Sequence, residues 1–341
     1  RAQLRRLLLA DTAGVVGRSR VRSLRALLAG PETFEEMVPG FATLPLQEFV
    51  ELSRHLRAGS PARYLRLLDA TAEAPDETVR SATMLERIRL DIARGWAARV
   101  DSSLAVGAYG DYARGHRAAA ELMLVASDLA GMGDRAAATR AVGALARYIP
   151  RDSALAYFPD HPVWPVAWML GAWNAQHGDT LTSHQWMDVI GGFPPGGTPK
   201  DYRGGLQADI EARLAMRRGD AAAAIAMERR AMDLWSIHTD NNFEYLPEPM
   251  MRLTLALLLR DAGQREEAAA VFSSLVLPTT WMGFLTARAD LEMGELAAEA
   301  GDTAGARLHL GRTLDLWDGG GPAVSDRAAR ARERLDALEG R

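Results

Sequence analysis

The strongest constraint on the fold is a short turn sequence that opens two matching segments. Residues 219–235 and 301–317 both begin with Gly-Asp and end with Asp-Leu-Trp, with the same spacing between the two ends. Glycine can adopt the left-handed conformation that ends a helix, and the aspartate after it can accept hydrogen bonds from free amides of the next helix. The repetition therefore predicts an array of helical hairpins.

A glycine followed by a polar residue recurs between helical stretches along most of the chain. The spacing is roughly 36–45 residues when Gly95 is taken as the turn of a degenerate unit. An amphipathic stretch precedes each glycine, and several units have an alanine five residues after it, where a small side chain lets two helices approach closely. The turns are Gly59-Ser60, Gly133-Asp134, Gly178-Asp179, Gly219-Asp220, Gly263-Gln264 and Gly301-Asp302, and the alanines are Ala138, Ala224, Ala268 and Ala306.

Composition favours a helical chain and excludes several kinds of site. Alanine, arginine and leucine are abundant, aromatic residues make up only 7%, and strand signals are nearly absent. Cysteine is absent, which rules out disulfides, zinc–thiolate sites and a catalytic thiol. The longest apolar runs, at Leu7–Ala10 and Leu255–Leu259, are far too short to span a membrane. We therefore predict an all-α protein without a transmembrane segment.

The residues around the turns are more specific. Leu170-Gly171 stands about two helical turns before Gly178, and Met293-Gly294 stands at the same distance before Gly301. A proline or glycine follows several second helices, as at Pro278. This pattern resembles the tetratricopeptide repeat. The resemblance implies a right-handed α-solenoid of about seven antiparallel helical hairpins.

The resemblance divides the chain into four regions. It is convincing from about residue 120 to residue 318 and only suggestive from residue 41 to residue 110. A final Arg/Ala/Leu-rich helix at 323–338 is expected to cap the solenoid with a polar outer face. The regions are a basic N-terminal connector or helix at 1–40, divergent helical repeats at 41–110, tetratricopeptide-like repeats at 111–318, and a linker with the capping helix at 319–341.

The closing stretch from Gly294 to Leu338 is also similar to the ends of repeat arrays fused behind bacterial serine/threonine kinases. The chain has no His-Arg-Asp or Asp-Phe-Gly motif, so the kinase activity itself does not carry over. The chain begins at Arg1 rather than methionine, and we expect it to be processed or part of a longer protein. The resemblance implies a non-catalytic scaffold or a regulatory or sensory domain of a larger bacterial protein, located in the cytoplasm.

Residues 1–25 form a basic segment with seven arginines and a single acid, Asp11. Such a segment could contact nucleic acid or an anionic lipid surface. The alternative is a solvated connector. We favour the connector and do not expect nucleic-acid binding, because no aromatic residue that could stack on a base occurs before Phe34.

The resemblance also implies which side chains line a concave groove. Mapped onto this chain, the family's groove positions give a mixed set of apolar and charged residues, which suits a protein or peptide partner. Asp209 and Arg213 have an alternative interpretation, an ion pair one helical turn apart. The predicted groove residues are Met123, Ser127, Trp168, Ala172, Asp209, Arg213, Leu253, Leu257, Leu291 and Glu295.

An aromatic cluster precedes a long loop rich in glycine and proline at 191–205. Aromatic anchors beside a long loop are typical of a binding hot spot or a ligand pocket. Two alternatives stay open: the rings fill the core, or segment 157–202 with His161 lines the pocket of a small-molecule sensor or enzyme. The cluster contains Tyr157, Phe158, Trp164, Trp168, Trp173, Trp186, Phe193 and Tyr202, of which we add Trp164 and Tyr202 to the predicted partner-binding residues. Trp235 and Trp317 share one repeat position and are predicted to be packing residues.

No pattern of catalytic residues is convincing. His177 and His184 lie on either side of the Gly178 turn and need not share a face, so we predict no metal site there. Asp160-His161 and His238 with Asp240 could be acid–base pairs, but both lie in turn-like segments where solvated residues are the simpler reading. We therefore expect no enzyme activity, no cofactor and no metal. The sequence does not predict the oligomeric state.

Overall fold

The structure is a computed structural model that describes residues 31–59, 61–106, 112–147, 163–192, 202–235, 247–275 and 283–339. Within these residues the chain is helical and contains no strand. It divides into two compact units. The first comprises residues 1–90, 106–113 and 277–281, and the second comprises residues 91–105, 114–276 and 282–341.

The first unit packs short helices around aromatic side chains. Its elements are α3 (Pro31–Met37), the 3-10 helix η2 (Val38–Thr43), α4 (Leu46–Gly59), α5 (Pro61–Thr71) and α6 (Glu77–Ala93), whose end belongs to the second unit. The rings of Phe34 and Phe41 lie 5.6 Å apart, and both are buried. The buried Tyr64 hydroxyl donates to Glu86, which joins α5 to α6.

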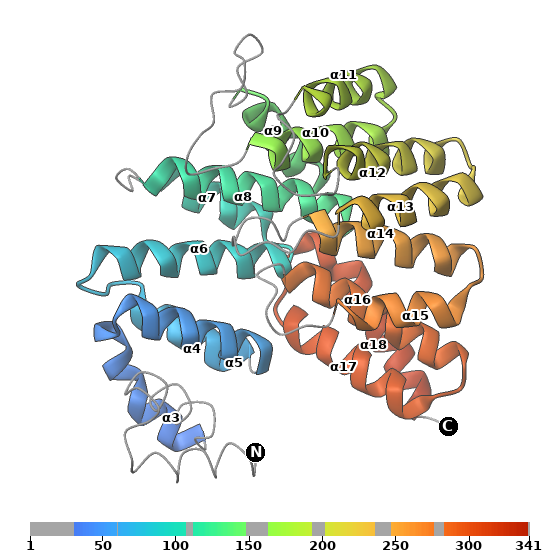
Figure 1. Cartoon of the computed structure of the whole chain (residues 1–341). Coiled ribbons are helices and arrows are strands. Elements are labelled where there is room, and N and C mark those ends of the chain that lie inside the picture. Colours follow the sequence, from blue (N-terminus) through green and yellow to red (C-terminus); the bar gives the residue numbers. More distant parts are fainter. Residues whose placement is uncertain are drawn as a thin grey trace, which may run out of the picture. The chain divides into compact units, whose positions relative to one another are not determined.

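The second unit is a series of helical hairpins, and neighbouring helices in the chain pack against each other (Figure 1). The pairs α10–α11, α12–α13, α14–α15 and α16–α17 each form such a hairpin. The helices are α7 (Ala97–Val106), α8 (Tyr112–Leu129), α9 (Arg135–Leu145), α10 (Val163–His177), α11 (Thr180–Gly191), α12 (Tyr202–Arg217), α13 (Ala221–Trp235), α14 (Pro247–Asp261), α15 (Arg265–Ser273), α16 (Gly283–Glu299), α17 (Thr303–Trp317) and α18 (Pro322–Glu339). This arrangement confirms an all-α helical array.

Four of the six predicted turns have the expected backbone. Gly178, Gly219, Gly263 and Gly301 adopt φ values between 76° and 88°, in the left-handed region that favours glycine. Gly95, taken as the turn of a degenerate unit, also has a positive φ of 75°. These turns are confirmed.

The predicted capping by aspartate is also confirmed. Each of the four aspartates accepts a hydrogen bond from the amide three residues later, which satisfies a free donor at the start of a helix. The caps are Asp134, Asp179, Asp220 and Asp302, with O···N distances of 2.9, 3.0, 3.0 and 2.9 Å. Gln264, in the equivalent place before α15, makes no side-chain cap.

One predicted turn glycine is wrong. The left-handed residue between α8 and α9 is Gly131, with φ of 68°, and not Gly133. The amide of Gly131 donates to the Asp128 carbonyl at 2.8 Å and the amide of Met132 to the Ser127 carbonyl at 2.8 Å, which closes the end of α8. Gly133 is needed for space instead, because a β-carbon there would lie 2.5 Å from the Asp128 amide nitrogen.

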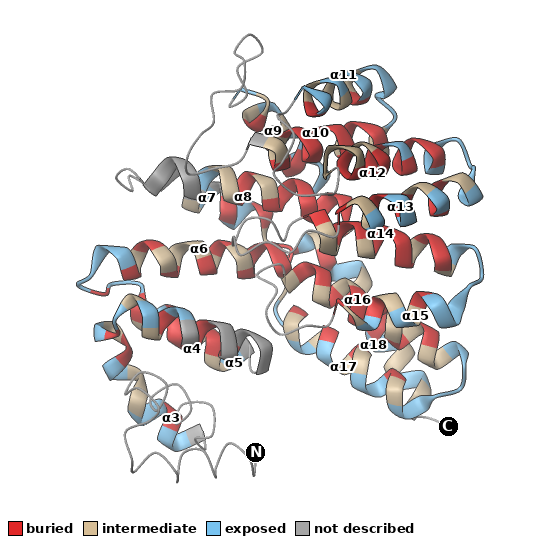
Figure 2. Cartoon of the chain, in the orientation of Figure 1, coloured by how far each residue is buried: buried red, intermediate tan, exposed pale blue. Residues whose placement is uncertain are grey.

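The first helix of each hairpin is the inner one. Helices α10, α12 and α14 are buried over most of their length, whereas α11, α13 and α15 bury one face (Figure 2). Small residues permit this packing. A β-carbon on Gly171 would lie 2.5 Å from the Ile210 side chain, and one on Gly294 would lie 2.7 Å from the Leu310 side chain. The predicted close-contact alanines Ala138, Ala224, Ala268 and Ala306 have no exposed surface.

The beginning of the second unit contacts its end. The amide of Gly321, just before α18, donates to the Arg94 carbonyl at 2.7 Å. The indole Nε1 of Trp96 donates to the Gly319 carbonyl at 3.0 Å. The backbones approach so closely that a β-carbon on Gly321 would lie 2.3 Å from the Gly95 carbonyl oxygen. The hairpin series of this unit is therefore joined at its two ends.

The predicted final helix is present as α18. It buries Val324, Ala328 and Ala331 along one face, and most of its other residues are exposed or half-buried. Its outer face is polar, as the sequence indicated.

Candidate functional site

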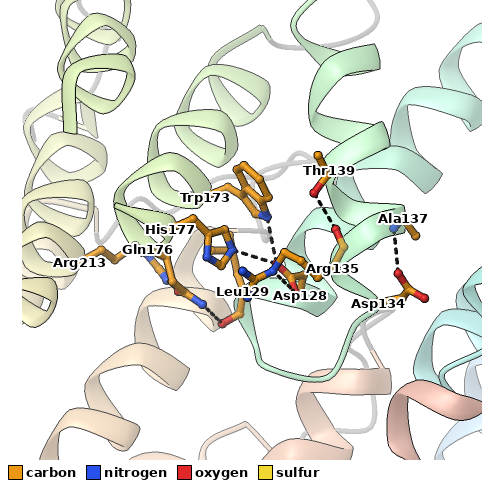
Figure 3. Close-up of polar contacts among 10 residues, drawn as sticks. All are labelled: Asp128, Leu129, Asp134, Arg135, Ala137, Thr139, Trp173, Gln176, His177 and Arg213. Carbon is orange, nitrogen blue, oxygen red and sulfur yellow. Dashed lines mark hydrogen bonds and ion pairs between the residues drawn. The ribbon is translucent and has the colours of Figure 1, made fainter. Parts of the chain in front are cut away.

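The end of α8 carries a buried carboxylate that joins three helices. Asp128, whose side chain is 5% exposed, accepts hydrogen bonds from α9 and α10 (Figure 3). Trp173 Nε1 lies 3.0 Å and His177 Nε2 lies 2.9 Å from its Oδ2 atom. Arg135 Nε lies 2.9 Å from Oδ2 and 3.1 Å from Oδ1. We call these four residues the Asp128 cluster.

His177 serves this cluster as a neutral donor. Its ring meets Trp173 edge-on, with the ring centroids 4.4 Å apart. Burial lowers the pKa of His177 below its ordinary value and outweighs the opposing effect of the Asp128 carboxylate. Because that carboxylate only accepts, the Nε2 atom of His177 carries the proton. In the described part of the chain no serine or threonine hydroxyl is bonded to His177, so this pair lacks the nucleophile of a hydrolytic triad.

A second buried carboxylate lies on α12. Asp209, with no exposed surface, accepts from Trp168 Nε1 at 2.8 Å. Arg213 Nε and Nη2 each lie 3.1 Å from an Asp209 oxygen, and Nη2 also lies 2.8 Å from Thr254 Oγ1. The ion pair between Asp209 and Arg213 that the sequence left as an alternative is therefore confirmed. With Glu228, these residues form what we call the Asp209 cluster.

Glu228, on α13, completes the Asp209 cluster. It has no exposed surface, and neither of its carboxylate oxygens accepts a hydrogen bond from a described residue. Burial, and then the charge of Asp209, raise the pKa of Glu228 well above the ordinary 4.5, while Arg213 opposes the shift. Glu228 therefore stays protonated well into the range where an exposed glutamate is ionised. A protonated Glu228 can donate a hydrogen bond, and Asp209 is the neighbouring acid that contributes to its raised pKa.

Gln176 connects the two clusters. Its Nε2 atom donates to the Leu129 carbonyl at 3.1 Å, and its Oε1 atom accepts from Arg213 Nη1 at 2.8 Å (Figure 3). Polar contacts thus run across the first helices α8, α10, α12 and α14. Because the buried groups are bonded to one another, they fix the positions of neighbouring hairpins.

The predicted groove residues fall into two groups. A side chain without exposed surface cannot contact a docked partner in this conformation, so partner binding stays a prediction chiefly for the half-buried residues. The buried ones are Met123, Ser127, Trp168, Ala172, Asp209, Arg213, Leu253 and Leu291, and the half-buried ones are Leu257, Glu295, Trp164 and Tyr202.

Trp164 and Tyr202 lie together at the beginnings of α10 and α12. Their ring centroids are 6.4 Å apart in an edge-on arrangement. Behind them Trp235 lies 5.2 Å from Trp164 and is only 3% exposed. Trp317 is also 3% exposed, so the packing role predicted for Trp235 and Trp317 is confirmed.

Several other predictions lie outside the described residues. These include the basic segment 1–25, the glycine- and proline-rich loop at 193–201, and the residues Tyr157, Phe158, His161, Phe193, His238 and Asp240. Among the described residues, no three histidine, aspartate or glutamate side chains gather as a metal site would require. No described helix is long and apolar enough to cross a membrane.

Sequence reasoning missed the Asp128 cluster and Glu228. One signal was available: Asp128 interrupts the apolar run from Leu122 to Ala130, and a charged residue in such a run is usually buried with a partner. The partner Trp173 is 45 residues away, so no local pattern identifies it. Glu228 has no comparable signal in its alanine-rich helix.

No protein-family model matches the sequence, and no curated protein is similar to it at a significant level.

Proposed function

We propose that this chain is a non-catalytic protein-binding module, a right-handed tetratricopeptide-like solenoid of about seven hairpins. In this proposal it is the scaffolding, regulatory or sensory part of a larger bacterial cytoplasmic protein. The stacked hairpins with glycine–aspartate turns support the architecture. The internal pairing of the Asp128 and Asp209 clusters supports a rigid frame more than a reaction centre.

The observation that carries the binding role is the half-buried pair Trp164 and Tyr202. The two rings come from neighbouring hairpins, so they form one apolar surface that spans two units of the array. Trp235 packs against Trp164, which helps to hold that ring in place. Tryptophan and tyrosine in such a fixed, partly exposed position are the residues most often found at binding hot spots. The partner is a peptide or protein with an apolar anchor.

The test is a peptide-display selection on the full chain, followed by affinity measurements on variants. The double variant Trp164→Ala, Tyr202→Ala should weaken a selected peptide by about tenfold or more. Leu181→Ala is the matched control, because Leu181 is a large apolar residue that is 72% exposed on α11. This control should bind as the unchanged protein does. If the double variant loses its thermal transition, Tyr202→Ser alone provides the comparison.

Two outcomes would contradict the proposal. One is that peptides bind the double variant and the unchanged protein equally. The other is that a parallel thermal-shift screen yields only metabolites or nucleotides as ligands. The second outcome favours the alternative, a small-molecule sensor or enzyme whose pocket is lined by segment 157–202.

A further inference from the structure

Two arginines from the end of the array reach the turn between α8 and α9. The position where a β-carbon of Gly131 would stand lies 3.4 Å from Arg288 Nη1 and 3.5 Å from Arg327 Nη2. Gly131 has no side chain, and its φ of 68° disfavours any residue that has one. A guanidinium nitrogen from α16 and another from α18 therefore lie close to the same turn.

The nearby acid does not satisfy these groups. Glu292 pairs through Oε1 with Arg288 Nη2 at 2.7 Å, and its Oε2 atom pairs with Arg260 Nη1. Arg288 Nε is buried without an acceptor, and Nη1 makes no bond to a described residue. Arg327 makes no hydrogen bond or ion pair within the described part of the chain. The N–H groups that face the Gly131 turn are thus free to bind an acceptor.

The local charge also favours an anion. Burial, and then the charges of Arg288 and Arg330, lower the pKa of Arg327, while Glu292 and Asp326 oppose this. Burial likewise lowers the pKa of Arg288; the neighbouring Arg260 adds to the effect, and Glu292 and Asp261 oppose it. Positive charges held close together and partly out of water repel each other unless an anion lies between them.

We propose that Arg288, Arg327 and the Gly131 turn bind a phosphate group, either as the free ion or as part of a small molecule. A phosphate oxygen beside the turn would accept charge-assisted hydrogen bonds of about 2.7–2.9 Å from these guanidinium nitrogens. Guanidinium groups from two different helices can bond to different oxygens of a tetrahedral phosphate. A planar carboxylate, in contrast, can be paired fully by a single guanidinium group. The site goes beyond the proposed partner-binding role and uses none of the same residues.

The test is isothermal titration calorimetry of the full chain at low ionic strength with inorganic phosphate, and in parallel with AMP. Low salt is needed because screening weakens exposed charge interactions. Binding should saturate at one site, and Arg327→Gln should weaken it by about tenfold or more. Because Arg327 makes no ion pair among the described residues and lies beside Arg288 and Arg330, this variant should melt at the same or a higher temperature. Arg332→Gln, an exposed arginine on the same helix, is the matched control and should bind as the unchanged protein does.

The two ligands distinguish the source of the phosphate. Tighter binding of AMP assigns the site to a nucleotide, and equal or tighter binding of inorganic phosphate assigns it to the free ion. Either assignment also requires that Arg327→Gln weakens the binding of that ligand. The proposal is overturned if neither ligand saturates, or if Arg327→Gln and Arg332→Gln weaken binding equally, since that result indicates diffuse charge attraction only.

Discussion

Replacing Glu228 with glutamine tests whether the Asp209 cluster holds a buried proton. Glutamine has nearly the shape of a protonated glutamate, and its amide can donate a hydrogen bond as a carboxylic proton can. Because the two side chains are nearly equal in size, the fully buried site can hold glutamine without repacking. The variant therefore isolates the ionisation of this one group.

The expected effect is a change in how stability depends on pH. An acid with a raised pKa keeps a proton in the folded state that the unfolded chain releases. Its stabilising contribution is fully present below the ordinary pKa of 4.5 and is lost as pH rises toward the higher folded pKa. Across that window, the extra proton of the folded state makes the free energy of unfolding fall by about 1.4 kcal/mol for each unit that the pH rises. Glu228→Gln lacks this slope. Its free energy of unfolding, relative to that of the unchanged protein, should therefore increase by the same amount for each unit that the pH rises.

The assay is urea unfolding followed by far-UV circular dichroism at several values between about pH 5 and pH 8. The quantity to plot is the difference in free energy of unfolding between Glu228→Gln and the unchanged protein. Glu211→Gln, an exposed glutamate on α12, is the matched control and should give a flat difference. A flat difference for Glu228→Gln as well would refute the buried proton.

Two further changes test the packing. Trp168→Phe should lower the free energy of unfolding by about 1–3 kcal/mol, because buried Asp209 loses its indole donor; urea unfolding measures this, and unchanged stability would contradict the assigned bond. Gly321→Ala should lower the melting temperature in scanning calorimetry, because its β-carbon would lie 2.3 Å from the Gly95 carbonyl oxygen. Gly311→Ala has no atom within 4 Å of the added carbon and should be neutral or stabilising, so equal losses in both variants would argue against the contact.

The hairpin turns were predictable because their chemistry is local. A left-handed glycine and a capping aspartate act within a few residues, so Gly219-Asp220 and Gly301-Asp302 indicate a turn before the fold is known. The turn after α8 shows the limit of this rule. Glycines stand on both sides of Met132, and only the hydrogen bonds that end α8 decide that Gly131, and not Gly133, is left-handed.

The exposure of the groove residues was harder to predict, because it depends on contacts between successive hairpins. Counting back from a turn places Trp168 and Asp209 on the first helices correctly. It does not reveal that the two side chains bond to each other across 41 residues and leave no surface exposed. A charged residue in an apolar helix predicts a buried partner, but only the packed structure identifies that partner.

The contact between the ends of the second unit gives these observations a common meaning. In an open solenoid each repeat contacts only its neighbours, so small changes in packing accumulate into a change of curvature. Here the bond between Trp96 and Gly319 joins residues 223 apart and limits such a change. Gln176 adds a second constraint, since it fixes the spacing of the inner helices from Leu129 to Arg213. The phosphate site proposed at Gly131 would link the α8–α9 turn to the final helices, α16 and α18. A bound anion would therefore replace repulsion between arginines with a further link in the frame that presents the half-buried aromatic pair.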